Sequence, residues 1–183
     1  QFSDVDHLVL NEAELTLPLF LADLANGGAK PLYSTSGFAE MSNSPLPAYQ
    51  LLGTKYYGAL SVQLSRGCPY QCDFCDVTTL FGRRPRIKTA AQTVAELDNI
   101  YRTGWRGKIY FVDDTLMADR RCLKEELLPA IIQWKRGKRG ISFHTQITMN
   151  LADDQELMDL MYEAGFDWVC IGIETPDESS LAE

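Results

Sequence analysis

Strand and helix patterns alternate regularly from residue 59 to residue 174, and this alternation is the strongest constraint on the fold. Four short runs have strand character, at 59–65, 108–114, 142–148 and 167–174, and longer runs with helical spacing of apolar residues separate them. Strands that are joined through helices pair in parallel with right-handed crossovers. The alternation therefore predicts an α/β fold with a parallel sheet.

The predicted helices carry specific end signals. Thr89 and Gln92 have the spacing of a capping box, in which the two side chains satisfy backbone N–H groups reciprocally. Pro129 lies inside the helical run 119–135, where it predicts a kink or a split because proline cannot donate the helical hydrogen bond. Thr175, followed by Pro176, predicts the start of one more helix after the last strand.

The strands have one apolar face and one polar face. In the third strand, Phe143 and Ile147 alternate with His144, Gln146 and Thr148. A sheet covered by helices on both sides is apolar on both faces, so this pattern favours a partial barrel whose polar lumen holds a ligand. In such barrels the functional side chains gather at the carboxyl ends of the strands.

Three cysteines follow the first of these strands within eight residues: Cys68, Cys72 and Cys75. Thiolates are soft ligands that suit iron–sulfur clusters and zinc. A structural zinc site needs a fourth protein ligand, and Cys122 and Cys170 are distant in the sequence. Three thiolates would instead leave one iron open to a substrate or cofactor. A zinc-stapled interaction module remains the alternative.

Composition narrows the class of protein. The chain has 183 residues and a formal net charge of −8, which argues against nucleic-acid binding through a basic face. No apolar run has the length of a transmembrane segment. The five cysteines are clustered rather than evenly spaced, which is typical of a metal site in a reducing compartment and predicts a cytoplasmic protein. Gln1 replaces an initiator methionine, so we expect a fragment of a longer chain.

Two segments precede the barrel pattern. His7–Leu10 is predicted to be a strand and residues 16–25 a helix that ends at Gly27 and Gly28, so residues 1–28 form one βα unit. Residues 29–58 are rich in proline, glycine and small polar residues and are predicted to be a linker. The barrel segment then covers residues 59–183.

The spacing of Cys68, Cys72 and Cys75, with the aromatic Phe74 before the third cysteine, resembles the signature of the radical S-adenosylmethionine enzymes. The resemblance implies a [4Fe-4S] cluster whose open iron binds the amino and carboxylate groups of S-adenosylmethionine. It implies reductive cleavage of that cofactor with an electron from a flavodoxin or ferredoxin. It also implies a barrel of six βα units, of which this chain contains the first four.

The same resemblance suggests which side chains contact the cofactor. Asp113 and Asp114 stand where the family binds the methionine amino group, and a strand-end pair or helix cap is the alternative. Glu174 resembles an acid that binds the ribose hydroxyls, although it could instead face the dipole of the next helix. Gln146 and Thr148 on the predicted polar face are further candidates for hydrogen bonds to the cofactor, with simple polar lining as the alternative.

Two further features of the barrel segment are open to two interpretations. Phe74 is a candidate for contact with adenine, or else a core aromatic. The basic residues Arg83, Arg84, Arg86 and Lys88 form either an anion clamp or a solvated loop.

The N-terminal segment has a finer resemblance. Residues 4–14 and 17–24 resemble the tail of the Rossmann-like cobalamin-binding domain that precedes a subgroup of these enzymes, which includes hopanoid methylases. Asn11 stands where that subgroup often has glycine. The resemblance implies cobalamin in the full-length parent and methyl transfer to an unactivated carbon of a small-molecule or lipid-like substrate. The alternative is a fragment that binds the cluster but is catalytically incomplete.

Overall fold

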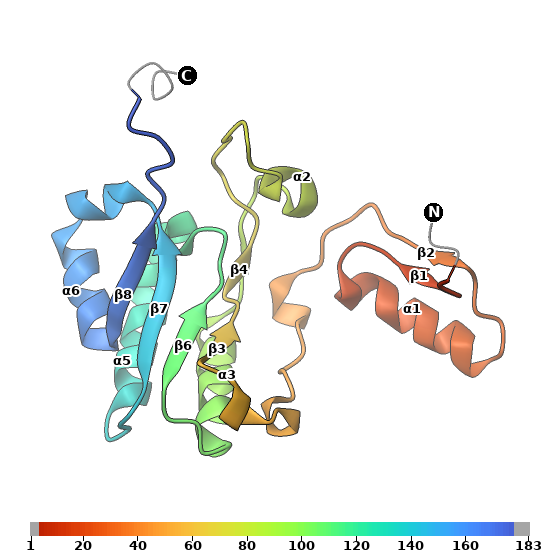
Figure 1. The fold of residues 1–183 in the computed structure, drawn as a ribbon, viewed down its shortest axis with the longest axis horizontal. Helices are drawn as coiled ribbons and strands as arrows, with labels where there is room; N and C mark the ends of the chain where they lie inside the picture. Colours follow the sequence, from red (N-terminus) through yellow and green to blue (C-terminus); the bar gives the residue numbers. More distant parts are fainter. Residues whose placement is uncertain (1–3, 178–183) are drawn as a thin grey trace.

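The computed structural model describes residues 4–177, and its centre is a sheet of four parallel strands (Figure 1). The strand order follows the chain order, as expected for successive crossovers. The strands are β3 (Ala59–Val62), β6 (Lys108–Phe111), β7 (Ser142–Ile147) and β8 (Phe166–Ile171). The predicted α/β fold with a parallel sheet is confirmed, whereas closure into a partial barrel of four βα units remains a prediction.

Helices cover one face of this sheet (Figure 1). They are α3 (Ala90–Arg102), α5 (Leu128–Lys135) and α6 (Gln155–Ala164). The capping box of Thr89 and Gln92 is formed at the start of α3, as predicted. Asp154 caps α6 by accepting a hydrogen bond from the backbone N–H of Leu157.

The segment before α5 is divided into short helical pieces. They are the 3₁₀ turn η4 (Leu116–Asp119), the α-helical turn α4 (Arg120–Cys122) and the π-helical turn η5 (Leu123–Leu127). Pro129 then lies in the first turn of α5, where its missing N–H is not needed. The helical run continues through Pro129 without a gap, and a π-helical turn directly before it is where the hydrogen-bond pattern changes.

The main core lies between the sheet and its helices. Phe143 is fully buried there, and its ring centroid lies 5.6 Å from that of Phe111 and 5.3 Å from that of Phe166. Leu97 of α3 and Ile131 of α5 reach the same core with no exposed surface. The apolar face predicted from the alternation in β7 is confirmed by this packing.

Among the described residues, no helix covers the other face of the sheet (Figure 1). Tyr110, His144 and Trp168 lie side by side in the strand register, and the ring centroids of His144 and Trp168 are 5.3 Å apart. Val112 is also exposed here, at 39%. This face is therefore mixed rather than polar throughout, because β6 and β8 contribute apolar side chains that the pattern of β7 does not show.

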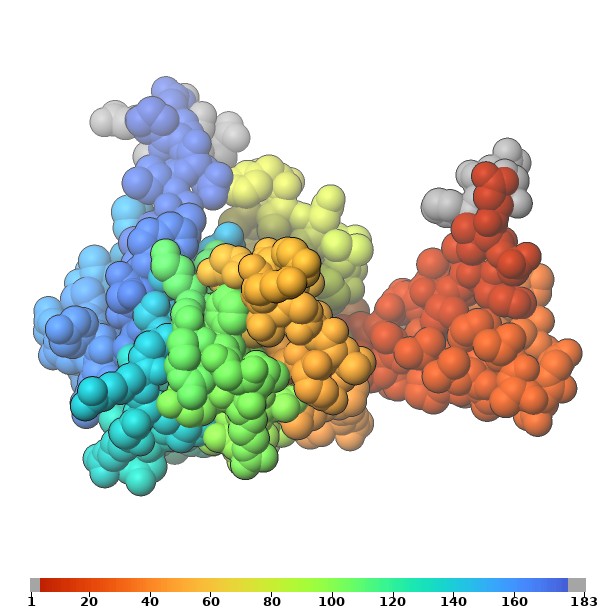
Figure 2. Space-filling view, turned by 60° about the horizontal axis from the view of Figure 1, so that its bottom comes forward, coloured from red at the N-terminus to blue at the C-terminus, as the bar shows by residue number. Residues whose placement is uncertain are grey.

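The N-terminal residues form a small βαβ unit that projects beside the sheet (Figures 1 and 2). Strands β1 (Leu8–Val9) and β2 (Leu32–Tyr33) pair in parallel around helix α1 (Ala13–Ala25). The helix begins three residues earlier than predicted, and β2 lies inside the segment predicted to be a linker. The βα unit thus continues as far as Tyr33.

The connection from β2 to β3 contains only short 3₁₀ turns, in agreement with its predicted irregular character. These turns are η1 (Met41–Asn43), η2 (Tyr49–Leu51) and η3 (Thr54–Tyr56). At the other end of the chain, residues 175–177 are not helical, and the rest of the predicted last helix lies outside the described residues. Within residues 4–177, no helix has the length and apolar character needed to cross a membrane.

Candidate functional site

The three clustered cysteines lie in one long loop at the carboxyl end of β3. The predicted strand 59–65 ends at Val62, and the chain then forms a separate strand, β4 (Ser65–Arg66). This strand pairs antiparallel with β5 (Arg86–Ile87). We call the segment between them, residues 67–85, the cysteine loop. It contains the short helix α2 (Val77–Phe81) and extends beyond the end of the sheet (Figure 1).

Gly67 begins the cysteine loop in a conformation that only glycine adopts readily. Its φ is +95°, and a Cβ atom there would lie 2.9 Å from the carbonyl oxygen of Gly82 and 3.1 Å from those of Phe81 and Arg84. The next residue, Cys68, donates its backbone N–H to the same Gly82 oxygen at 3.3 Å. The two ends of the loop are therefore in direct contact at its base.

All three cysteines of the loop are free thiols. Cys72 is exposed, whereas Cys68 and Cys75 are half-buried. Burial raises the pKa of the Cys68 thiol, and repulsion from Cys72, Asp114 and Cys75 adds to this effect, so these groups are electrostatic neighbours. The donor set suits an iron–sulfur cluster. As they stand, the side chains in residues 4–177 form no group of three acidic, histidine or cysteine ligands around one metal position.

The two adjacent aspartates after β6 have different environments. The Asp113 carboxylate is 2% exposed and accepts hydrogen bonds from the Leu64 N–H, the Ser65 N–H and the Ser65 hydroxyl. Burial is the largest influence on Asp113 and raises its pKa to about 6, against the lowering effect of these hydrogen bonds. Asp113 therefore attaches β4 to the end of β6.

Asp114 faces the cysteine loop. It is half-buried, and its Oδ2 accepts a hydrogen bond from the Gly67 N–H at 3.1 Å. It is also one of the charges that act on Cys68. Of the two aspartates predicted to meet the methionine amino group, Asp114 is thus the one placed beside the cysteines.

A polar contact links the end of β7 to the cysteine loop. Thr148, just after β7, donates a hydrogen bond to the side-chain oxygen of Asn150 in the 3₁₀ turn η6 (Met149–Asp153). The Asn150 amide then contacts the Tyr70 hydroxyl at 3.5 Å. Gln146 is exposed on the uncovered face of the sheet and pairs in register with Cys170. The sequence had not singled out Tyr70, because only the folded loop brings it to Asn150.

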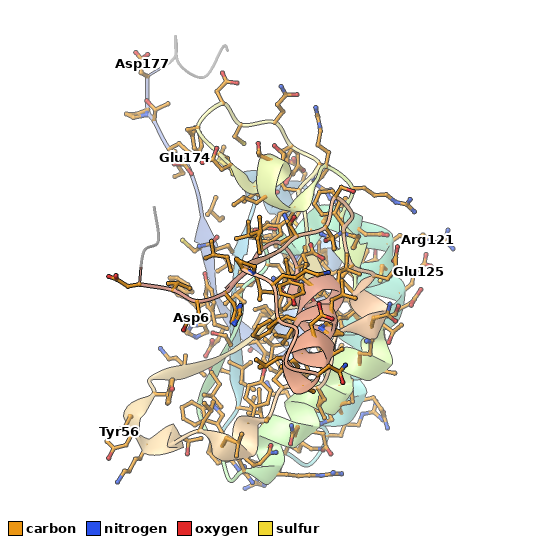
Figure 3. All side chains as sticks on the ribbon, turned by 90° about the vertical axis from the view of Figure 1, so that its right-hand side faces the viewer. Asp6, Tyr56, Arg121, Glu125, Glu174 and Asp177 are labelled. Atoms are coloured by element: carbon orange, nitrogen blue, oxygen red, sulfur yellow. The ribbon has the colours of Figure 1, made fainter. Side chains whose placement is uncertain are left out.

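Phe74 and Glu174 are both exposed. Phe74 is 72% exposed, so the alternative that it is a core aromatic is wrong. Glu174 follows β8 with a left-handed φ of 61°. It lies at the same end of the molecule as the cysteine loop (Figure 3). The helix whose dipole was the alternative partner of Glu174 lies mostly outside the described residues.

The basic run after Gly82 is divided between solvent and the interior. Arg83 and Arg84 are exposed and line a cavity of about 510 Å³ together with Phe38 and Glu40. Arg86 is instead paired with a buried carboxylate of the N-terminal unit, and Lys88 is buried against Glu96. The solvated-loop alternative is therefore wrong for Arg86 and Lys88.

The fold and the loop together define a class of protein: a parallel α/β sheet with a three-thiol loop at the carboxyl end of its first strand. The chain belongs to the Radical SAM superfamily, whose family model matches residues 62–182. The resemblance inferred from the cysteine spacing is confirmed, and the zinc-stapled module is not favoured.

Two similar proteins have names that describe methyl transfer. An uncharacterized methyltransferase of Synechocystis is 44% identical over 99% of this chain and 34% of its own length. The hopanoid C-2 methylase of Rhodopseudomonas palustris is 37% identical over 98% of this chain and 35% of its own length. The chain therefore spans about a third of these two curated relatives.

A solved structure has a similar fold. It is the radical S-adenosylmethionine methyltransferase TsrM of Kitasatospora setae with cobalamin and a [4Fe-4S] cluster bound. The similarity has a TM-score of 0.58 at 20% identity and covers 67% of this chain and 23% of that protein. At this identity the comparison shows the fold alone.

Proposed function

We propose that this chain is the cofactor-binding part of a radical S-adenosylmethionine methyltransferase. The observation that carries the proposal is the placement of three free thiols in one loop, at the carboxyl end of the first parallel strand. Cys68, Cys72 and Cys75 would hold a [4Fe-4S] cluster. When bound, the cluster and S-adenosylmethionine supply a carbon-centred radical through one-electron reductive cleavage of the sulfonium.

Asp114 is the best-placed carboxylate for the methionine ammonium group. It lies on the cysteine-loop side of the strand end and hydrogen bonds to Gly67, directly before the first cysteine. A carboxylate forms a charge-assisted hydrogen bond to an ammonium group. Asp113, with its hydrogen bonds already made to Leu64 and Ser65, would act by positioning the strand that leads into the loop.

The other predicted cofactor contacts surround the same end of the sheet. Glu174 would accept hydrogen bonds from the ribose hydroxyls, and Gln146 and Thr148 would donate to the cofactor from β7. Phe74 presents an exposed ring that suits stacking on adenine. Each of these contacts is a proposal that rests on placement at the carboxyl ends of the strands.

We further propose methyl transfer to a carbon of a small-molecule or lipid-like substrate, with cobalamin in the full-length protein. The names of the relatives support this reaction. The N-terminal βαβ unit supports a cobalamin-binding domain, because Leu19, Leu21 and Leu24 of α1 are about half exposed. A helix with such apolar surface usually packs against further protein. Residues 1–28 would then be the end of that domain, and residues 29–58 mainly the connection to the barrel.

The reaction needs a one-electron donor, and a flavodoxin or ferredoxin fits the exposed cations of the cysteine loop. Arg83 and Arg84 are exposed near the cysteines, on a chain whose net charge is −8. Such a local positive patch would steer an acidic electron carrier toward the loop. Reduced, clustered cysteines are typical of the cytoplasm, which is the proposed location.

Anaerobic reconstitution of the chain with iron and sulfide tests the proposal. We expect iron, labile sulfide and a broad visible absorption band, all lost when Cys68, Cys72 or Cys75 is replaced by alanine. Cys122→Ala is the matched control and should leave the cluster in place. Bound zinc without sulfide would instead support the interaction module.

A second assay separates an active enzyme from an incomplete fragment. A reconstituted and reduced chain should convert S-adenosylmethionine to 5′-deoxyadenosine and methionine. A chain that retains its cluster but forms no 5′-deoxyadenosine would be a cluster-binding fragment without catalytic activity.

A further inference from the structure

We infer that Glu12 and Glu14, at the start of α1, are positioning residues for the cysteine loop. They bind Arg66 and Arg86, which are the last residue of β4 and the first residue of β5. We call these four residues the clasp. That the loop holds a cluster rests on the proposed function, whereas the effect of the clasp on the loop itself does not.

Arg86 makes the more buried half of the clasp. Its Nη1 and Nη2 donate to the two oxygens of Glu12 at 2.7 and 2.6 Å, the geometry of a bidentate pair. Nη2 also donates to the carbonyl oxygen of Phe81, inside the cysteine loop, at 3.1 Å. The side chains of Arg86 and Glu12 are 10% and 5% exposed. One guanidinium group therefore joins α1 to the loop directly.

Arg66 makes the second bidentate pair. Its Nη1 and Nη2 donate to the two oxygens of Glu14 at 2.9 and 2.8 Å, and its Nη1 lies 3.5 Å from Glu12. The pKa of Glu14 is lowered to about 2, and the hydrogen bonds from Arg66 are the largest cause. Glu14 is thus held as a carboxylate at any ordinary pH, and Arg66 lies only two residues before Cys68.

The need for the clasp follows from the register of the two strands. Arg66 and Arg86 are directly paired across the β4–β5 ladder. Two like charges directly opposite each other destabilise an antiparallel pair. Removing one partner of a buried ion pair also leaves an uncompensated charge. The carboxylates of α1 therefore permit the strand pairing that closes the base of the cysteine loop.

Glu12 and Glu14 also bind the irregular connection that follows β2. Glu12 accepts the N–H of Ala39 at 2.7 Å, and Glu14 accepts the hydroxyl of Ser44 at 2.8 Å. The start of α1 is itself fixed by Asn11, which adopts a φ of 66° and accepts the N–H of Thr35 at 3.2 Å. The N-terminal unit, the connection and the cysteine loop are thus held by the same two carboxylates.

Amide hydrogen exchange of the full chain without cluster tests the clasp directly. The N–H groups of Gly67, Cys68 and Lys88 are hydrogen bonded at the base of the loop. Glu12→Gln should speed their exchange at least about tenfold, which corresponds to roughly 1.4 kcal/mol. The Phe143 N–H, bonded to Gly165 at 2.9 Å in the main sheet, should keep its protection. Unchanged exchange at the loop base, or equal acceleration at Phe143, would overturn the inference.

A matched control and a rescue complete the experiment. Glu125→Gln breaks the exposed pair between Arg121 and Glu125, which lies at the right-hand edge of the molecule in Figure 3, and should change none of these amides. Arg66→Glu should speed amide exchange at the base of the loop. Adding Glu14→Arg should slow it again, because the ion pair then forms with the two charges exchanged. Failure of this double variant to recover any protection would show that the charges do not act through each other.

Measuring the affinity for S-adenosylmethionine distinguishes a failure of the clasp from a failure of the proposed function. In the reconstituted chain, Glu12→Gln should retain iron and sulfide but bind S-adenosylmethionine at least about tenfold more weakly. An unaltered affinity would contradict the effect of the clasp on the cluster site. If the unmutated chain takes up no cluster, the proposed function fails, whereas the exchange result at Gly67 and Cys68 still decides the clasp.

Discussion

At the scale of single residues, strand alternation separates Asp113 from Asp114. Asp113 is two residues after the buried Phe111 and shares its face, whereas Asp114 is two residues after the exposed Val112. Successive side chains of a strand point to opposite faces, so one carboxylate enters the interior and the other faces the open side. The two aspartates are equal candidates by residue type, and the alternation of side chains along β6 is what distinguishes them.

The raised pKa of Asp113 predicts a specific dependence of stability on pH. The carboxyl group has a pKa of about 6 in the folded chain and 3.8 as its ordinary value, so the folded state binds the proton more tightly. Compared with Asp113→Asn, the unmutated chain should lose free energy of unfolding as the pH rises from about 4 to about 6, by roughly 3 kcal/mol at most. Urea unfolding at a series of pH values measures this difference, and a constant or rising difference would contradict it.

Lys88, which the sequence places in a basic run, forms a buried ion pair with Glu96. Burial raises the pKa of Glu96, and the second oxygen of this carboxylate has no hydrogen-bond partner. Lys88→Met should therefore lower the free energy of unfolding by roughly 3–5 kcal/mol, because it leaves the acid unpaired. The double variant Lys88→Met with Glu96→Leu should recover much of this loss in the same denaturant titration. A double variant less stable than the single variant would argue against the buried pair.

At the scale of elements, local signals predicted the regular structure well. Thr89 with Gln92 and the apolar period of α3 are short-range patterns, and the structure forms them as expected. The contacts of Arg86 were not predictable in this way, because its partner Glu12 lies 74 residues earlier. A basic residue in a run looks the same whether its partner is water or a distant carboxylate. The prediction of the site was therefore limited because the local sequence does not distinguish a solvated arginine from one paired with a distant carboxylate.

Gly67 gives a prediction for the cysteine loop as an element. Gly67→Ala forces a Cβ against the carbonyl oxygens of Gly82, Phe81 and Arg84 and should cost about 1–3 kcal/mol of local strain. We expect reduced iron and sulfide content after reconstitution, measured per chain. Gly58→Ala is the control, since a Cβ there meets nothing within 4 Å. Equal cluster content in the two variants would show that the loop base tolerates the added atom.

At the scale of the whole molecule, stability depends mainly on the core between the sheet and its helices. Phe143 of β7 packs against Phe111 of β6, Phe166 of β8 and Trp134 of α5. Phe143→Ala should reduce the free energy of unfolding by about 3–5 kcal/mol, as large cavities in aromatic cores do. Tyr162→Ala, which removes an 82% exposed ring from α6, should change it little. Similar losses in the two variants by denaturant titration would rule out this core as the main source of stability.

The narrow base of the cysteine loop has a consequence for how such a chain can vary. The cysteine loop begins and ends at two paired strands of two residues each, β4 and β5. These strands fix the ends of the loop independently of the residues between them. Each doubling of the length of a flexible loop raises the free energy of loop closure by only about 0.6 kcal/mol. Extra residues between Cys75 and Gly82 would leave the register of β4 and β5 intact. The surface above the cysteines can thus be remodelled for new reactants without disturbing the sheet beneath it.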